Sequence, residues 1–299
     1  MTERSAERSD VGWLGRTALY AVLVVASVGF MIPFLFALGT SLKPPPLLHA
    51  VPPILFPPLN DMHPENYYRI FNIPYVPYDL FYRNTVIITL AAMTGAVLSA
   101  TASAYGFARF RWPGRDFFFL VLLATLVLPE EVVLIPKFLL FHFVPMAVFG
   151  DTWIDTWWPL ILPSWFGGGA FSVFLLRQFF MQLPRELDEA AVLDGANSWH
   201  IFWHIIVPLS KPALATVAIF AFLGNWNDFI HPLIYLNTPA KFPLSVGLRW
   251  LTQQPTDPIE PRENLLMAAS VLMLAPAIVL FFSMQRYFVR GIVMTGIKG

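Results

Sequence analysis

The stretch DEAAVLDGANSWHIFWHIIVP, residues Asp188–Pro208, carries acids, a glycine and two histidines, yet long apolar runs flank it on both sides. Its beginning has the composition of a helix N-terminus. Pro184 is a favourable first helical residue, and the acids Glu186, Asp188 and Glu189 complement the positive end of a helix dipole. These residues predict a short helix that starts at Pro184.

A second helix is expected after a sharp turn. Gly195 fits just beyond the end of the first helix, where the backbone needs the left-handed conformation that glycine adopts without strain. Asn197 or Ser198 can cap the next helix. Apolar side chains then recur with the i, i+3, i+4, i+7 spacing of one helix face until Pro208 stops the helix, at Trp199, Phe202, Trp203 and Ile206.

The predicted helix–turn–helix therefore has an aromatic face, and periodicity leaves two interpretations of it open. An amphipathic helix of this kind can lie on lipid headgroups at a membrane surface. The same spacing also serves a helix that docks into a groove of a partner protein.

The composition of the whole chain is that of a membrane protein. Of its 299 residues 57% are hydrophobic and 13% are charged, with a mean hydropathy of +0.61, whereas soluble domains contain about 25% charged residues. The net charge is zero and the pI about 7.0, which removes any electrostatic case for nucleic-acid binding. The absence of cysteine excludes disulfides, thiolate chemistry and cysteine-ligated metal sites.

Apolar runs of about 20 residues are long enough to cross a bilayer. The third run is uninterrupted only to Leu128 and reaches that length by continuing through Pro129 to about Ile135, so we expect it to break near one membrane face. The fourth run is interrupted by Gly167–Gly169, for which we favour close helix packing over a backbone break that lines a pore. The sequence predicts six spans, at residues 17–38, 85–105, 117–135, 157–180, 212–236 and 265–288.

The distribution of basic residues predicts the orientation of these spans. With both termini in the cytoplasm, twelve of the 19 Lys and Arg residues lie inside and seven outside, as the positive-inside rule requires. The domain organisation that follows is an N-terminal cytoplasmic tail (1–16), a single transmembrane domain (17–290) and a C-terminal cytoplasmic tail (291–299). The expected fold class is an all-α polytopic membrane protein, with the loop 184–211 on the cytoplasmic side between the fourth and fifth spans.

The same loop carries a family resemblance. Glu189-Ala190-Ala191, three residues, Gly195, nine residues and Ile205-Ile206-Val207-Pro208 resembles the EAA loop of ATP-binding cassette (ABC) importer permeases, whose pattern is E-A-A, three residues, G, nine residues, I-x-L-P. Val207 stands where the family has Leu, a small apolar change. Further segments are similar to the carbohydrate-uptake branch, and there to the smaller permease subunit of maltose-type transporters: Phe174–Phe180, Phe222–Asp228, Gln285–Gly291 and Lys298–Gly299. The match is dense from about Phe117 and looser before it.

The resemblance implies a permease subunit that moves a carbohydrate across the bacterial or archaeal cytoplasmic (inner) membrane by alternating access. The carbohydrate class includes sugars, oligosaccharides, polyols and sugar phosphates. The implied partners are a second permease subunit in a heterodimer, a dimer of cytoplasmic ATP-binding subunits, an extracytoplasmic solute-binding protein and membrane lipid. The loop would act as a coupling helix seated in a cleft of the ATPase, through Glu189, Ala190, Gly195, Trp199, Phe202, Trp203 and Pro208.

Catalytic chemistry is not expected in this chain. It has no Walker A sequence and no convergent catalytic residues, so it is predicted to be no enzyme and to bind no cofactor, with ATP and Mg used by the partner ATPase. The alternative is an ion-coupled secondary transporter, which needs coupling-ion residues at mid-membrane and usually an inverted repeat. Asp228 is the single candidate for such a residue, and no repeat is visible.

Polar residues in the fifth span form a candidate substrate path. Asn225, Asn227 and Asp228 fall past the bilayer midplane, where an ionisable group normally faces a cavity or a partner. Two interpretations stay open: a polar lining of the path, and hydrogen bonding between helices.

No functional role is assigned to two other groups of polar residues. His200 and His204 have the i, i+4 spacing of metal ligands, but no third ligand is evident, so no metal is expected. Glu130 and Glu131, beside Pro129, are expected at a solvated helix end without an assigned role.

Overall fold

The computed structural model describes residues 13–73, 76–253 and 262–296. Every regular element in these ranges is a helix, which confirms the all-α fold class. Residues 1–12 and 297–299 of the two predicted tails lie outside the described residues. By its internal contacts the chain divides into two compact units, Met1–Ile70 with Pro255–Leu272 and Phe71–Gln254 with Met273–Gly299.

The first unit is built around the end of helix α1 (Trp13–Ser41). The short helices η1 (Pro45–Leu47), η2 (Leu59–Asp61) and α2 (Asn66–Arg69) follow it. The buried amide of Asn66 donates hydrogen bonds to the carbonyls of Ser41 at 3.0 Å and Lys43 at 3.1 Å. The buried amide of Asn264, at the start of α14 (Glu263–Gly296), also donates to the Lys43 carbonyl at 3.0 Å. Two side-chain amides therefore fix the turn that follows α1.

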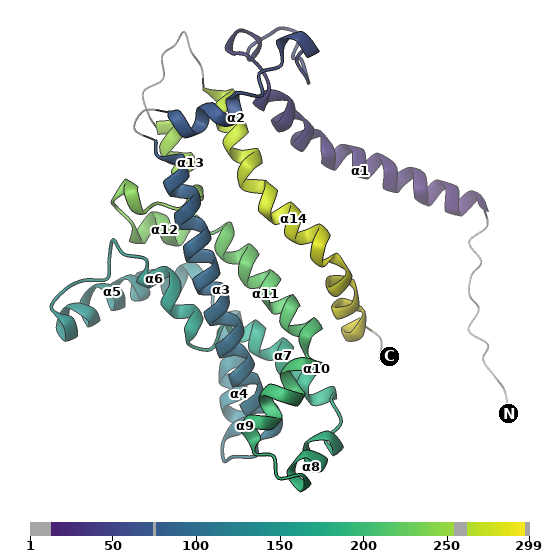
Figure 1. Cartoon of the computed structure of the whole chain (residues 1–299), viewed down its shortest axis with the longest axis vertical. Helices are drawn as coiled ribbons and strands as arrows, with labels where there is room; N and C mark the ends of the chain where they lie inside the picture. Colours follow the sequence, from purple (N-terminus) through teal and green to yellow (C-terminus); the bar gives the residue numbers. More distant parts are fainter. Residues whose placement is uncertain (1–12, 74–75, 254–261, 297–299) are drawn as a thin grey trace. The chain divides into compact units, whose positions relative to one another are not determined.

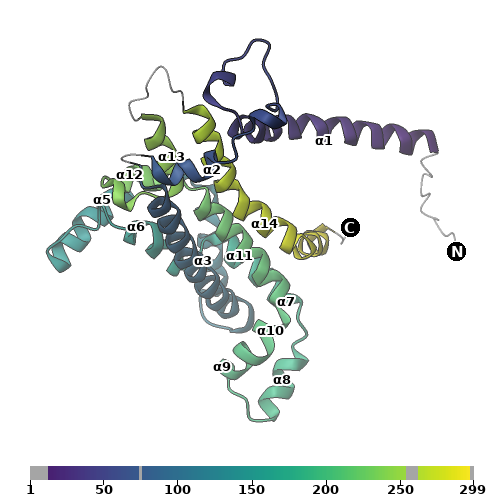
Figure 2. The same cartoon turned by 45° about the horizontal axis from the view of Figure 1, so that its top comes forward.

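The second unit is organised by helix α3 (Tyr78–Arg109), which packs along α7 (Ala170–Gln182) and α11 (Lys211–Trp226) (Figure 1). A stripe of buried small residues with i, i+4 spacing lets the helices approach closely: Ala92, Ala96, Ala100, Ala104 and Ala108. Among the other elements of this unit, α12 and α13 lie near the start of α3 and α8 to α10 near its end (Figures 1 and 2), while η5 packs against its middle, where Ser99 bonds to Ser164.

The bounds of those elements follow the chain. They are η3 (Ile70–Asn72, at the border of the units), α4 (Arg115–Ala124), η4 (Thr125–Val127), α5 (Glu130–Phe149), α6 (Trp158–Ile161), η5 (Leu162–Trp165), α8 (Glu186–Leu193), α9 (Ser198–Ile201), the π-helical turn η6 (Phe202–Ile206), α10 (Val207–Leu209), α12 (Ile230–Tyr235), η7 (Pro239–Lys241) and α13 (Leu244–Gln253).

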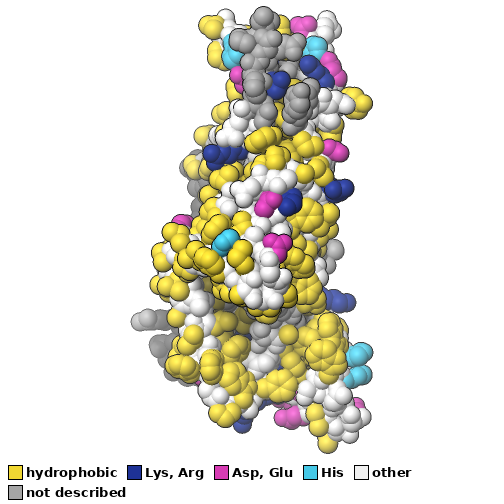
Figure 3. Space-filling view, turned by 90° about the vertical axis from the view of Figure 1, so that its left-hand side faces the viewer, with side chains coloured by type: hydrophobic (Ala, Val, Ile, Leu, Met, Phe, Trp, Pro, Cys, Tyr) yellow, Lys and Arg dark blue, Asp and Glu magenta, His cyan; other side chains and the backbone are white. Residues whose placement is uncertain are grey.

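The described residues contain five helices that are long and apolar enough to cross a membrane, and up to six if one bent pair counts as a span. The five are Gly15–Ser41, Tyr78–Arg109, Glu130–Phe149, Trp158–Gln182 and Glu263–Met284. The bent pair is Ser198–Leu209 with Lys211–Trp226, at an angle of 79°. On the face shown in Figure 3 hydrophobic side chains predominate and charged ones are sparse, as expected of a surface that meets lipid or another apolar chain.

The predicted third and fifth spans differ from the observed helices. The run 117–135 is divided between α4 with η4, which ends at Val127, and α5, which begins at Glu130 and has the length of a span by itself. Pro129 stands at the break because it has no N–H to continue the helix. The run 212–236 is also divided, since α11 ends at Trp226 and α12 begins at Ile230.

The glycine interruption of the fourth span is both a break in the helix, between η5 and α7, and a packing contact at Gly168. All three residues of Gly167–Gly169 have positive φ values, +90°, +59° and +86°. A Cβ atom on Gly168 would lie 2.2 Å from the carbonyl oxygen of Ala96 on α3. Glycine is therefore required both by the backbone conformation and by the close approach to α3, as the packing interpretation expects.

Candidate functional site

The helix–turn–helix predicted from the sequence is present at the Arg109 end of α3 (Figure 2). We call the segment from α8 to α10, residues 186–209, the EAA hairpin. Helix α8 begins at Glu186, two residues after the predicted start, and has its acids in the first turn. Gly195 has φ +84°, and the N–H of Ala196 donates to the carbonyl of Ala191 at 2.8 Å. The left-handed turn at Gly195 is confirmed.

The second arm of the EAA hairpin begins at a side-chain cap. Asn197, not Ser198, is the N-cap, and its side-chain oxygen accepts a hydrogen bond from the N–H of His200 at 2.8 Å. The helix then widens into a π turn, in which the N–H of Val207 bonds to the carbonyl of Phe202. It continues through the exposed Pro208 to Leu209, one residue beyond the predicted stop.

The predicted aromatic face of this helix is split between the interior and the surface. Phe202 is 3% exposed and Ile206 is fully buried, whereas Trp199 is 67% and Trp203 41% exposed. The ring centroid of Phe202 lies 5.0 Å from that of Tyr105 on α3. The expectation that Phe202 packs in a partner's cleft is therefore wrong, because packing on α3 makes this ring part of the chain's own core.

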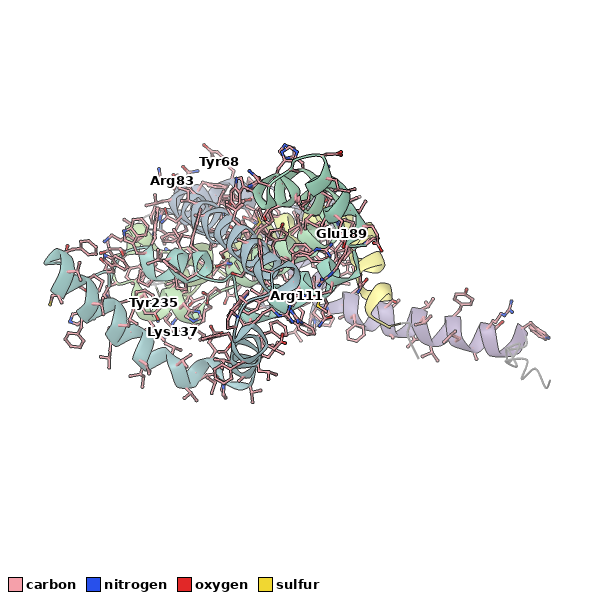
Figure 4. The ribbon with its side chains drawn as sticks, turned by 90° about the horizontal axis from the view of Figure 1, so that it is seen from below. Tyr68, Arg83, Arg111, Lys137, Glu189 and Tyr235 are labelled. Carbon is pink, nitrogen blue, oxygen red and sulfur yellow. The ribbon has the colours of Figure 1, made fainter. Side chains whose placement is uncertain are left out.

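Six of the exposed residues of the EAA hairpin form what we call the hairpin surface: Glu189, Ala190, Val192, Leu193, Trp199 and Trp203. Glu189 makes no ion pair and no side-chain hydrogen bond with the described residues; Figure 4 labels its position. A surface with one unpaired carboxylate among large apolar side chains has the chemistry of a contact with another protein that supplies a basic group.

The two histidines of the hairpin are exposed. The rings of His200 and His204 stack with their centroids 4.0 Å apart, and Nδ1 of His204 lies 3.2 Å from the carbonyl oxygen of His200. No group of three or more potential metal ligands occurs among the described residues. The pair is part of the outer face of the hairpin.

A second polar region lies where α11 ends. Asn225 and Asp228 line a small pocket with Thr85 and Thr89 of α3, and the hydroxyl of Thr89 is buried without a hydrogen-bond partner among the described residues. Asn227 is exposed and lies outside the lining. The structure thus brings two of the three predicted path residues together and leaves the third apart.

The side-chain N–H groups of Asn225 and Asn227 bond to carbonyls of their own helix. Asn225 donates to the carbonyl of Ala221 at 2.7 Å and Asn227 to that of Leu223 at 2.9 Å, both within α11. The hydrogen bond to another helix comes from Trp226, whose Nε1 donates to the carbonyl of Met273 on α14 at 2.9 Å. The amide donors of Asn225 and Asn227 therefore form no interhelical hydrogen bond among the described residues.

His231 connects this pocket to helix α5. Its Nδ1 lies 3.0 Å from an Asp228 carboxylate oxygen, and its Nε2 lies 3.2 Å from Oε1 of Glu130. Lys137 of α5 is 3.7 Å from the same Glu130 oxygen, and Figure 4 labels Lys137 and Tyr235. The sequence did not suggest a role for Glu130, because its partner His231 is about a hundred residues away in the chain. Both Glu130 and Glu131 are exposed.

Comparison with known proteins identifies related transport proteins. The family model described as "binding-protein-dependent transport system inner membrane component" matches residues 78–294. The arabinooligosaccharides transport system permease protein AraQ of Bacillus subtilis (strain 168) is 31% identical over 284 residues, which cover 95% of this chain and 96% of that protein. The sn-glycerol-3-phosphate transport system permease protein UgpE of Yersinia pestis is 35% identical over 217 residues, 73% of each chain.

A solved structure shares the fold. It is that of a bacterial ABC transporter involved in the import of the acidic polysaccharide alginate, with a TM-score of 0.78 at 22% identity. The similarity covers 96% of this chain and 99% of the matched chain.

Proposed function

The chain belongs to the family of binding-protein-dependent transport system inner membrane components, and from this premise we propose that it is the permease subunit of an ABC importer that moves a carbohydrate by alternating access. Members of the family are transport components rather than enzymes, and this one is a multi-pass membrane protein. The carbohydrate class is supported by the relatives named for arabinooligosaccharides and sn-glycerol-3-phosphate.

The family name itself implies a solute-binding protein as one partner. We further propose a second permease subunit, which would form a heterodimer with this chain, and a dimer of ATP-binding subunits that uses ATP and Mg. In this assembly both termini and the EAA hairpin face the cytoplasm, in agreement with the excess of Lys and Arg on that side.

The observation that carries the proposal is the hairpin surface. Glu189 would pair with a basic group of the ATPase, and the exposed rings of Trp199 and Trp203 would pack in its cleft beside Ala190. Gly195 gives the turn its shape, and Pro208 lies next to the bend that leads into α11. Asn225 and Asp228 would line the solute path from the pocket beside Thr89.

The chain contains no cysteine, so single cysteines test this assembly directly. We expect Trp199→Cys to crosslink to the co-expressed ATP-binding subunit, whereas Asp151→Cys, exposed in the loop after α5, should not. Glu189→Gln should lower ATP-driven uptake by about tenfold, the usual size of a coupling effect, while the exposed Glu186→Gln should not. Labelling of Trp199→Cys by a membrane-impermeant thiol reagent from outside intact cells would contradict the proposal, and uptake driven by an ion gradient without ATP would favour a secondary transporter.

A further inference from the structure

The last turn of α3 is joined to the first arm of the EAA hairpin by a buried arginine. The guanidinium Nε of Arg109 lies 3.2 Å from Oδ2 of Asp188 on α8, and its side chain is only 6% exposed. Its Nη2 donates a hydrogen bond to the carbonyl of Leu183, just before α8, at 3.1 Å. One side chain of α3 thus contacts both the beginning of α8 and the segment that leads into it.

The second arm is joined to α3 one helical turn earlier. The hydroxyl of Tyr105 donates a hydrogen bond to the carbonyl of Ser198, the first residue of α9, at 3.0 Å. The ring of Tyr105 packs on Phe202 in the π turn. Tyr105 and Arg109 have i, i+4 spacing and so lie on one face of α3. That face contacts both arms of the hairpin, while Gly195 connects the arms at the turn.

Neighbouring carboxylates on α8 point to different surroundings. Asp188 faces α3 and Arg109, whereas Glu189 belongs to the hairpin surface. Consecutive residues on a helix are about 100° apart, which separates these two directions. An ion pair with one buried partner resists separation, because moving Asp188 (22% exposed) alone leaves the buried charge of Arg109 uncompensated. A force that displaces α8 through Glu189 therefore also displaces the end of α3.

We propose that Arg109 and Tyr105 are positioning residues of the transport cycle, which make α3 move with the EAA hairpin. This inference rests on the proposed function. Helix α11 comes directly after the EAA hairpin in the chain, whereas α3 contacts the hairpin only through its side chains. At its other end α3 carries Thr85 and Thr89, which line the pocket with Asn225 and Asp228. Because α3 is one continuous helix, a movement at Arg109 also moves its other end, at the proposed solute path.

The test uses the complete transporter, with both permease subunits, the ATP-binding subunits and the binding protein reconstituted in liposomes. Tyr105→Phe removes only a hydroxyl, and Arg109→Gln removes the charge together with the contacts of the guanidinium to Asp188 and Leu183. The two quantities to measure are ATP hydrolysed and solute transported, on the same vesicles. We expect each variant to keep its ATPase activity while the solute transported per ATP falls, by about tenfold for Arg109→Gln.

Two further variants separate a positioning role from a merely structural one. Arg109→Lys keeps a charge that can reach Asp188 and should recover part of the transport per ATP. Arg111→Gln is the matched control, because this exposed arginine two residues later forms no ion pair with the described residues, and its transport per ATP should be unchanged. A ratio equal to the wild type in Arg109→Gln and Tyr105→Phe, or a parallel loss of transport and ATPase activity, would overturn the inference.

Crosslinking through Trp199→Cys distinguishes this failure from that of the proposed function. If the crosslink to the ATP-binding subunit forms in the Arg109→Gln background and the transport ratio does not change, only the role of α3 is wrong. If no crosslink forms in the otherwise wild-type chain, the proposed function is wrong as well.

Discussion

The carboxylate of Asp155 accepts two hydrogen bonds from Thr238, one from the backbone N–H at 2.9 Å and one from the hydroxyl at 2.6 Å. It also accepts the N–H of Asn237 at 2.9 Å and lies 2.9 Å from Nζ of Lys241. Asp155 has a φ of +59°, which is unfavourable for a residue with a side chain. These contacts hold that conformation and join the loop before α6 to the turn before α13.

The stability of this junction should depend on pH. Partial burial acts to raise the pKa of Asp155, but the hydrogen bonds from Thr238 and Asn237 and the contact with Lys241 outweigh it, so the pKa lies well below its ordinary value. A lowered carboxylate pKa stabilises the fold above the unfolded value of about 3.9, and this contribution is lost as the pH falls towards the folded value. We expect Asp155→Asn to weaken the pH dependence of thermal unfolding in detergent below about pH 4. The exposed Asp151→Asn is the control; equal curves for Asp155→Asn and wild type would contradict the assignment.

Replacement of Gly168 should destabilise the protein. In Gly168→Ala the new Cβ meets the Ala96 carbonyl in a backbone conformation with positive φ, so we expect a loss of about 1–3 kcal/mol. Gly106→Ala in α3 is the control, because a Cβ there has nothing within 4 Å and the φ value is ordinary. Thermal unfolding in detergent measures both variants, and a Gly168→Ala protein as stable as Gly106→Ala would refute the packing role.

At the turn of the EAA hairpin, the effect of backbone conformation can be measured separately from steric crowding. A Cβ on Gly195 would meet nothing within 4 Å, so only the positive φ opposes a side chain. Asparagine tolerates this conformation better than alanine. Transport should therefore be lower in Gly195→Asn than in the wild type, and lowest in Gly195→Ala. The turn should be about 1–2 kcal/mol less stable with alanine than with glycine. Equal uptake by all three proteins would show that the shape of the turn does not matter.

The polar pocket predicts different effects for two neighbouring asparagines. Asn225 lines the pocket, whereas Asn227 is exposed outside it. If the pocket belongs to the solute path, Asn225→Ala should raise the half-saturating concentration of binding-protein-delivered solute about threefold to tenfold, the equivalent of one hydrogen bond. Asn227→Ala should leave it unchanged. The measurement is initial uptake rate against solute concentration, and an effect of equal size in both variants would contradict the assignment.

The features that the sequence predicted well depend on residues close together in the chain. The turn at Gly195, the acids of the first turn and the aromatic spacing are set by local backbone preferences. The apolar lengths of α1 and α3 follow from composition alone. Local information also left Asn197 and Ser198 as equal candidates for the cap, and only the hydrogen bond to His200 decides between them.

Features that depend on distant contacts could not be predicted in the same way. The split of the aromatic face arises because Phe202 packs on Tyr105, a residue of another helix. The contact between Glu130 and His231 has the same origin. The third span was placed at the apolar run that begins at Phe117, whereas in the structure α5 continues through Pro136 and Pro145 to Phe149.

The bend of 79° between Ser198–Leu209 and Lys211–Trp226 joins two helices into an angled lever within the second unit. Ser210, fully buried, is its pivot. Twelve helical residues on one arm and 16 on the other correspond to lengths of about 18 Å and 24 Å. With the bend held rigid, a force applied across the free end of the short arm would turn the long arm about Ser210 and move its far end about a third further.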